Sequence, residues 1–486
     1  MTVFHSRPPI LLLCALLSLG TAQAQDNTSA SPPVTAALNA PVQAATLPEV
    51  LAWLRSAPGW QAADYAYRAS ELQVQAAQIR AGLSLSVGGN ASAAKIPWDT
   101  GEWTGSGSLN ATLSASVLPW SPAREALRSA QRSHQAAATE LRRTRADLTV
   151  QAVRAYAGAS QAATGLSLAR AQRELAAQVL AVAQAQRSAG VIPSEVLLER
   201  QTALQNAEAG QAQAEREVTL AVNGLRRLLG RDVPLPGDPA AYAPVTFQVA
   251  NTDETALVAR ALTARSEVAR AQVAVLDAGA NLRTAELDTR LPDLSAAAQF
   301  GQIGTTDSTS GKRVAANFNL KTGVASAQAT LPLNDTSKLP TGAVLSLTAN
   351  LPVLGRTQGT ALAQARLGAE QAALALENAR QSVTLDVRTR LSEYLDEQGS
   401  LLALQTGVTR AQTILDATRA RQAAGTAAPL DVRQAELGLT QAQSALQAAQ
   451  QRLSIAALNL MQATGDLDPF LLATLPHLSP APGGRP

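Results

Sequence analysis

The sequence is poor in the residue types that build compact catalytic and metal sites. Among its 486 residues there are one cysteine, two methionines and three histidines, and aromatic residues make up only 3%. Beyond the first 24 residues the chain holds His134 and His477 and no cysteine. Neither a cluster of imidazole and thiolate metal ligands nor a Cys/His catalytic pair can be assembled from these residues. No glycine-rich phosphate loop follows a strand either. We therefore expect no enzyme activity, no metal site and no cofactor.

Charge of one sign is not concentrated anywhere in the sequence. Lysine and arginine number 40 against 37 aspartates and glutamates, a formal net charge of +3. The arginines are scattered along the chain and do not form one patch, whereas proteins that bind nucleic acid carry a clustered basic surface. The sequence therefore argues against nucleic acid as a partner.

Long apolar runs are also missing. Arg7 precedes a short apolar core, Ile10–Leu19, and Ala22-Gln23-Ala24 has the small-x-small pattern of a signal-peptidase site. This core is well below the roughly 20 residues that a membrane-spanning helix needs. We expect residues 1–24 to be a secretory signal peptide and residues 25–46, rich in Ser, Pro and Ala, to be a flexible lead. Any contact with a membrane must then use something other than a spanning helix.

What the sequence has instead is a long internal repeat. The segment Gly190–Gly230 recurs as Gly425–Gly465, so both bounding glycines are displaced by the same interval. The same displacement superimposes two sets of positions seven residues apart: Leu197, Leu204, Gln211, Val218 and Leu225 on Val432, Leu439, Leu446, Leu453 and Leu460. A spacing of seven marks the apolar face of a helix that packs on another helix. The sequence predicts a tandem duplication of coiled-coil helices.

Each copy forms the second arm of a helical hairpin. Ser121-Pro122 is a strong helix start, and no proline interrupts residues 123–192. A helix of that length would be roughly 100 Å long. A turn at 190–193 then leads into the helix that ends at Gly230. The second half repeats the plan with a turn around Pro429.

Two segments in each half alternate apolar and polar residues with the period of a strand. In the first half these are Leu83–Ala93 and Leu109–Val117, with a predicted loop over residues 95–107. In the second half such strands begin at Leu294 and Leu345.

The repeat and its breaks predict the domain organisation. We expect a first repeat over residues 47–235, a proline-rich linker over 236–252, a second repeat over 253–466 and a loose tail over 467–486. Only the second repeat contains an insertion near 305–340, with another alternating run at Ala325–Leu331. This insertion is either a surface loop or a set of additional strands.

Strands with one apolar and one polar face suit a wall between lipid and water. Four strands cannot close a barrel, but a homotrimer supplies three times as many and leaves no strand edge exposed to lipid. The expected fold is therefore mainly α with β, a trimeric tube whose β-barrel continues into a helical cylinder. Lipid-facing barrels usually carry aromatic girdles; here Trp98, Trp103, Trp120 and Phe300 near the strand ends would be a sparse version.

Matching short sequences mark the same points of both halves. They are Gly190-Val-Ile-Pro-Ser-Glu195-Val196 with Gly230, Gly425-Thr-Ala-Ala-Pro-Leu-Asp431-Val432 with Gly465, and Leu-Pro pairs at 118–119 and 351–352. Together with the order helix, two strands, long hairpin, they resemble the TolC family of outer-membrane efflux proteins over about residues 47–465. The resemblance implies a passive trimeric exit duct in the outer membrane with a helical tunnel in the periplasm. It also implies two partners, a periplasmic adaptor (membrane fusion) protein and an inner-membrane pump, in a tripartite efflux pump or a type I secretion system that exports drugs, metals or polypeptides.

The resemblance also implies roles for acidic residues at the hairpin tips, where carboxylates ring the closed aperture in that family. Asp431 matches the family's tip aspartate, and Glu195 is its first-half counterpart if the alignment slips by one residue. The next acidic position of the family is Gln434 here, so the ring would carry less charge. The alternative for both residues is an acidic side chain that the helix dipole favours in a first turn.

Small residues at the tips match positions that contact the adaptor in that family. These are Gly190, Val191 and Gly425. For the two glycines the alternative is a purely structural role in the turn.

Two other classes of protein share some of these features. A periplasmic adaptor also has a signal peptide and a helical hairpin, but one hairpin between lipoyl-like and small-barrel segments is expected there. A surface-attached coiled-coil structural protein accounts for the heptads but not for the paired amphipathic strands.

Overall fold

The computed structural model describes residues 46–95, 97–233, 242, 246–303, 310–333, 340–350 and 357–467, all within one compact unit. The predicted signal peptide, the lead up to residue 45, part of the linker, parts of the insertion, Leu351-Pro352 and the tail after residue 467 lie outside the described residues. The helices are α1 (Leu47–Leu54), α2 (Pro58–Ala81), α3 (Pro122–Ser188), α4 (Ser194–Leu229), α5 (Glu254–Ala264), α6 (Ser266–Arg290), α7 (Thr357–Ala423) and α8 (Pro429–Thr464). The strands are β1 (Leu83–Lys95), β2 (Trp103–Ser116), β3 (Asp293–Ile303), β4 (Ser310–Asn319), β5 (Val324–Pro332) and β6 (Thr341–Asn350).

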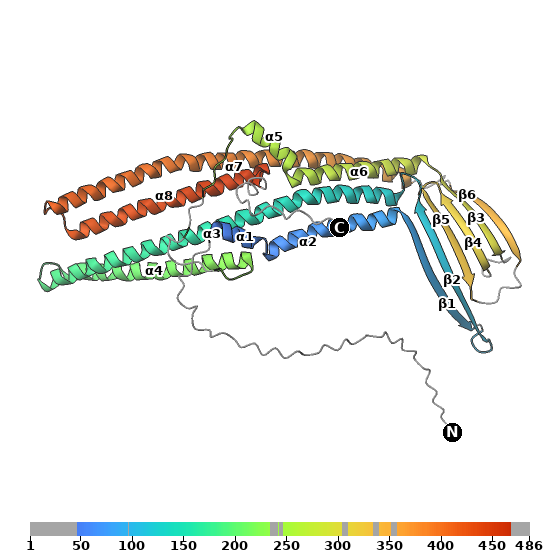
Figure 1. The fold of residues 1–486 in the computed structure, drawn as a ribbon, viewed down its shortest axis with the longest axis horizontal. Coiled ribbons are helices and arrows are strands. Elements are labelled where there is room, and N and C mark those ends of the chain that lie inside the picture. The colour runs from blue at the N-terminus through green and yellow to red at the C-terminus, as the bar shows by residue number, and fades with distance from the viewer. Residues whose placement is uncertain are drawn as a thin grey trace, which may run out of the picture. The chain divides into compact units, whose positions relative to one another are not determined.

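The predicted duplication of helical hairpins is confirmed. Helices α3 and α7 have 67 residues each, and α4 and α8 have 36 each. At about 1.5 Å per residue the long helices extend about 100 Å. Gly158 and Gly165 do not interrupt α3. Each long helix packs against the shorter helix that follows it, and Figure 1 shows the sheet at the opposite end from the hairpin tips.

Four helices form a layer that continues the sheet. Helix α2 packs on α3, α3 on α6, and α6 on α7, so the order across the layer is α2-α3-α6-α7. Each of these helices precedes or follows a strand in the chain: α2 leads into β1, β2 into α3, α6 into β3 and β6 into α7. The sheet is therefore held by the helices at four of its strands.

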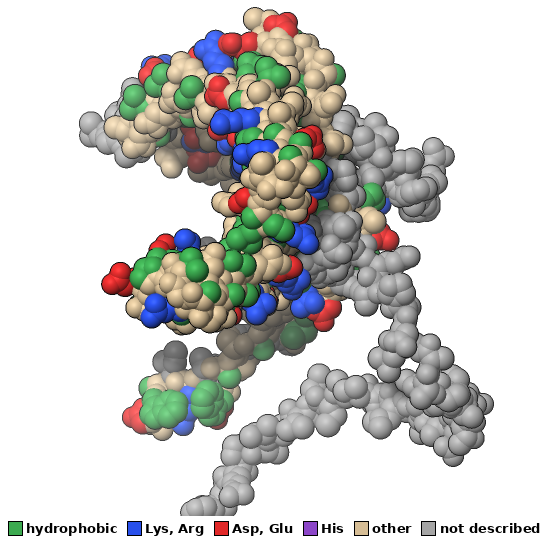
Figure 2. Space-filling model, turned by 90° about the vertical axis from the view of Figure 1, so that its left-hand side faces the viewer, with side chains coloured by type: hydrophobic (Ala, Val, Ile, Leu, Met, Phe, Trp, Pro, Cys, Tyr) green, Lys and Arg blue, Asp and Glu red, His purple; other side chains and the backbone are tan. Residues whose placement is uncertain are grey.

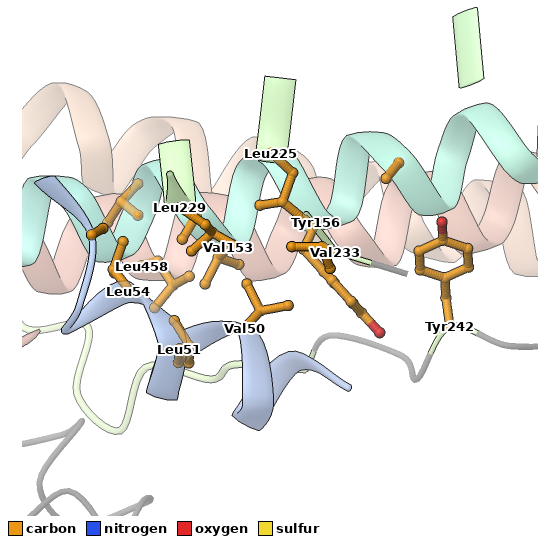
Figure 3. Close-up of a cluster of buried hydrophobic side chains, with 14 of the residues drawn as sticks. Val50, Leu51, Leu54, Val153, Tyr156, Leu225, Leu229, Val233, Tyr242 and Leu458 are labelled. Carbon is orange, nitrogen blue, oxygen red and sulfur yellow. The ribbon is translucent and has the colours of Figure 1, made fainter. Parts of the chain in front are cut away.

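The hydrophobic core lies where the short helices α1 and α5 brace the long hairpins. Figure 3 shows the first cluster, in which α1, α3, α4 and α8 bring together Val50, Leu54, Val153, Tyr156, Leu225, Leu229 and Leu458. Tyr242, from the predicted linker, packs edge-on against Tyr156 with ring centroids 5.5 Å apart. The second cluster is formed by side chains from α5, α6, α7 and α8, and it includes Leu257, Val387 and Leu460. Since α8 contributes to both clusters, the two halves share one packed region.

The strands form a single sheet of order β1-β2-β5-β4-β3-β6 in which all neighbours are antiparallel. The first half supplies two strands, as predicted, but the second half supplies four, because the insertion folds into β4 and β5 at the centre of the sheet. The alternating run Ala325–Leu331 lies within β5. Strand β4 was not predicted because it opens with Ser310–Arg313, a polar stretch that hides the alternation following it.

The predicted loop over residues 95–107 is shorter in the structure. Strand β1 reaches Lys95 and β2 begins at Trp103, which pairs with Lys95, so residues 97–102 are the described part of the connection. Gly105 and Gly107 suggested a loop because glycine has a low strand propensity. Their pairing with Ala93 and Ala91 in a long antiparallel ladder overrides this preference.

The turn between β4 and β5 fastens the inserted hairpin to the helices. The carbonyl of Gly323 accepts hydrogen bonds from the backbone N–H groups of Val117 (2.9 Å) and Leu118 (3.1 Å), just before α3 begins. The indole N–H of Trp120 donates to the carbonyl of Leu320 at 3.2 Å. Gly323 has φ +65°, and a Cβ there would lie 2.7 Å from Cβ of Leu118, so only glycine fits this turn.

Candidate functional site: a two-faced sheet and two hairpin tips

The sheet has one apolar face and one mainly polar face. Residues that pair directly across antiparallel strands point to the same face. One unbroken row across all strands reads Leu85, Leu113, Ala327, Ala316, Ala298, Leu345. On the opposite face a row reads Ser84, Ser114, Ser326, Asn317, Ala297, Ser346. The apolar face is thus built of Ala, Leu, Val and Phe, and the polar face mainly of Ser, Thr, Asn and Gln.

Large side chains of the apolar face are strongly exposed in the single chain. Leu345 is 85% exposed, Leu347 71%, Leu85 68% and Phe300 65%. A continuous apolar surface of this kind marks contact with lipid or with another protein. None of the described helices combines the length and the apolar character needed to cross a membrane.

Both hairpin tips have the same backbone geometry. Gly190 has φ +73° and Gly425 has φ +76°. The residue after each glycine donates its N–H to a carbonyl five residues back, Val191 to Gln186 and Thr426 to Arg421, both at 2.9 Å. This is the hydrogen-bonding pattern that ends a helix with a left-handed residue. A Cβ at either glycine would meet nothing within 4 Å, so backbone conformation and not crowding requires glycine.

The tip of α3/α4 presents an open apolar surface. Val191 is 70% exposed and follows Gly190, around which there is free space. Figure 2 views the molecule from the end that carries the hairpin tips and shows acidic and basic side chains interspersed with small and apolar ones.

Asp431 lies in the first turn of α8 and caps it. Its Oδ2 accepts the backbone N–H of Ala428 at 2.9 Å, which satisfies one of the free donors at the start of the helix. Asp431 also lines an open groove between α7 and α8, about 740 Å³ in volume, together with Arg410, Arg421 and Gln434. The carboxylate therefore has a structural role at the start of the helix, and two arginines line the same groove.

Glu195 lies in a different environment. It is exposed in the first turn of α4, and its side chain makes no hydrogen bond or ion pair with the described part of the chain. Glu195 belongs to the α3/α4 tip and Asp431 to the α7/α8 tip, so within one chain they mark separate tips.

Sequence reasoning missed a polar network between the halves. Nε of Arg143 on α3 lies 3.6 Å from Oε1 of Glu267 on α6. Asp147, one turn further along α3, accepts a hydrogen bond from Gln462 of α8. Arg143, Asp147 and Gln462 line a cavity of about 180 Å³ between α3, the α5–α6 junction, α7 and α8. No local signal could have revealed pairs more than 100 residues apart in sequence.

His134 has a packing role. Its Nδ1 is 2.9 Å from Oγ of Ser70, and its ring stacks on Tyr67 with centroids 4.9 Å apart.

The fold and the two-faced sheet can now be compared with known proteins. The sequence profile described as outer membrane efflux protein matches residues 52–231 and 257–466, which together cover most of the chain. The chain belongs to the outer membrane efflux protein family. This confirms the TolC-like resemblance and the predicted location in the outer membrane. The family consists of efflux ducts and is not a class of enzymes.

Solved structures with this fold include those of three membrane proteins. CusC has a TM-score of 0.63 and 15% identity, over 86% of this chain and 92% of CusC. VceC from Vibrio cholerae has a TM-score of 0.62 and 16% identity, over 86% of this chain and 96% of VceC. The MtrE channel of Neisseria gonorrhoeae, solved in an open state, has a TM-score of 0.62 and 18% identity, over 87% of this chain and 89% of MtrE. At such identities the likeness concerns the fold. A search of curated protein sequences finds no match.

Proposed function

We propose that three copies of this chain form a passive exit duct through the outer membrane. Their sheets join edge to edge into one barrel, with the apolar face toward lipid and the polar face toward a water-filled lumen. The single observation that carries this proposal is the two-faced character of a sheet whose outer strands, β1 and β6, lie at opposite ends of the strand order. Each unpaired backbone group in lipid costs several kcal/mol, so these edges require partners.

The helical layer supports the same assembly. Its outer helices are α2 and α7, and both carry large exposed apolar side chains: Leu72 and Ile79 on α2, and Leu374 and Leu402 on α7. In a ring, α7 of one copy packs against α2 of the next. Sheet and helices then close together, and the helices continue the barrel as a periplasmic tunnel.

The hairpin tips form the periplasmic entrance in this proposal. They lie at the end remote from the sheet, where Gly190, Val191 and Gly425 offer open, small or apolar surface to a periplasmic adaptor that links the duct to an inner-membrane pump. Either a tripartite efflux pump or a type I secretion system would use such an entrance. Membership of the efflux family favours this role over those of a periplasmic adaptor or a surface coiled-coil protein.

Two neighbouring alanines of β4 provide the test of the barrel. Ala316 pairs with Ala298 and Ala327 on the apolar face, whereas Ala315 pairs with Gln299 and Gln328 on the polar face. An arginine on a lipid-facing strand costs about 2–4 kcal/mol near the bilayer centre, and one facing water costs little. We expect Ala316→Arg to be lost from the outer-membrane fraction and Ala315→Arg to insert and assemble like the wild type. Equal behaviour of the two variants would refute the assignment of faces.

We further propose that Asp431, with Glu195 beside it in the ring of tips, lines the aperture. Asp431→Asn keeps an oxygen that can accept the N–H of Ala428 but removes the charge, so α8 should keep its thermal stability. We expect a change in the ion selectivity of the resting conductance in planar bilayers, and the same direction of change for Glu195→Gln. Unchanged selectivity in both variants would leave Asp431 with its capping role alone.

A further inference from the structure

One row of residues on the polar face of the sheet differs from the adjacent row toward the helices. From β1 to β6 it reads Gly88, Asn110, Thr330, Arg313, Gly301, Gly342. Three of its members have no side chain, two are short, and Arg313 alone is long. The adjacent row toward the helices, Ser86, Thr112, Gln328, Ala315, Gln299, Val344, contains no glycine and no charge.

Arg313 is also the only cationic residue on the polar face within the described strands. Lys95 and Lys312 occupy apolar-face positions by the alternation of β1 and β4. The only acidic residue at a polar-face position of these strands is Asp293, at the helix end of β3, and its Oδ1 accepts a hydrogen bond from Asn319 at 3.0 Å. Arg313 lies near the start of β4, at the end remote from the helices, so the two charges are at opposite ends of the sheet.

The glycines leave space around the guanidinium. A Cβ at Gly88 or Gly342 would meet nothing within 4 Å. Gly301 has φ +141° at a register shift in β3, and a Cβ there would lie 2.6 Å from Cα of Arg313, so no other residue fits opposite it. Arg313 is half-buried, and its side chain makes no ion pair or hydrogen bond with the described residues. A guanidinium with no carboxylate partner among these residues is a ready donor for a planar anion.

We infer that Arg313 forms an anion-binding level in the outer part of the duct. Its guanidinium binds carboxylate, sulfonate or phosphate groups of passing solutes, because the other residues of its row are glycines or have short side chains. This inference rests on the proposed function, because the polar face must line the lumen and three copies of the chain must bring three such arginines to one level.

Block of single-channel current by a soluble trivalent anion tests this assignment. The purified wild type and the variants Arg313→Gln, Arg313→Lys and Lys312→Gln are reconstituted in planar bilayers, with naphthalene-1,3,6-trisulfonate on both sides. Lys312→Gln is the matched control, since it removes the neighbouring cation on the lipid-facing side. We expect the anion to block the wild type and Lys312→Gln equally. Arg313→Gln should need at least about a tenfold higher concentration for the same block, because it loses a charge-assisted hydrogen bond to the anion. Arg313→Lys, which keeps the charge, should fall between them.

Each result decides between two proposals. Conducting channels whose block is the same in Arg313→Gln and in the wild type would overturn the anion-binding level and leave the duct intact. The same holds if the wild type conducts and is not blocked. Equal weakening in Arg313→Gln and Lys312→Gln would also overturn it, since a general surface charge would then explain the block. A wild-type preparation that forms trimers in detergent but never conducts would refute the duct and this inference with it.

Discussion

At the scale of residues, the boundary between the two halves holds two carboxyl groups with opposite electrostatic environments. Burial raises the pKa of Asp147, and nearby Arg143 and the hydrogen bond from Gln462 offset this only in part. Burial would also raise the pKa of Glu267, but its own backbone N–H and the cations Arg265 and Arg143 outweigh burial, so the pKa lies below its usual range. The two groups should therefore respond to pH in opposite directions.

Replacing each carboxyl by its amide tests this difference. The stability due to the raised pKa of Asp147 is complete below about pH 4, its ordinary value, and is lost as the pH rises through the folded value. Asp147→Asn should thus gain thermal stability relative to the wild type between about pH 4 and pH 7. Glu267 contributes its stability above its ordinary pKa and loses it as the pH falls, so Glu267→Gln should be less stable than the wild type at neutral pH. Melting temperatures of the wild type and of both variants, measured across this pH range, test the two expectations. The same pH dependence of the melting temperature in the two variants would contradict the prediction.

At the scale of elements, the joint between the inserted hairpin and α3 depends on few contacts. Trp120→Phe removes the indole donor to the carbonyl of Leu320 and should cost about 1 kcal/mol. Trp98→Phe is the control, because Trp98 is 75% exposed beyond the end of β1 and makes no such bond to the β4–β5 turn. We expect Trp120→Phe alone to lower the melting temperature of the purified assembly. Equal melting of both variants would show that the turn does not hold the hairpin in place.

The helices and strands also show which parts of the fold can be predicted from local sequence patterns. Heptads and turn residues predicted the long hairpins because a helix bonds within itself, so Gly190 and Gly425 could be placed at tips from sequence alone. The strand pattern found β1, β2, β3 and β6 and marked the alternating run that lies in β5, because side chains alternate strongly in these segments. It could not place β4 and β5 between β2 and β3, since that order depends on pairing of Ala115 with Ala325, residues far apart in the chain. The network around Asp147 stayed hidden for the same reason.

At the scale of the whole molecule, assembly is the property that a single chain cannot display. Leu374, 66% exposed on α7, lies at an outer edge of the helical layer, where the proposed ring requires an apolar contact. Leu374→Glu would place a charge in that contact, which is unfavourable without a partner. We expect the wild type to appear as a threefold tube in particle images with the mass of three chains, and the variant to release single chains that keep their helix content. A stable ring in the variant would show that the contact between copies does not include this edge of the helical layer.

The inserted hairpin also sets how well the two parts of the tube fit each other. Six strands spaced about 4.8 Å apart and tilted by about 40° cover an arc of about 38 Å. The four helices of the layer, about 9 to 10 Å apart, cover about the same arc. Four strands would cover only about 25 Å, and the wall would have to narrow where helix gives way to strand. In the proposed trimer, β4 and β5 match the circumference of the barrel to that of the tunnel, so the bore would keep one width across the junction.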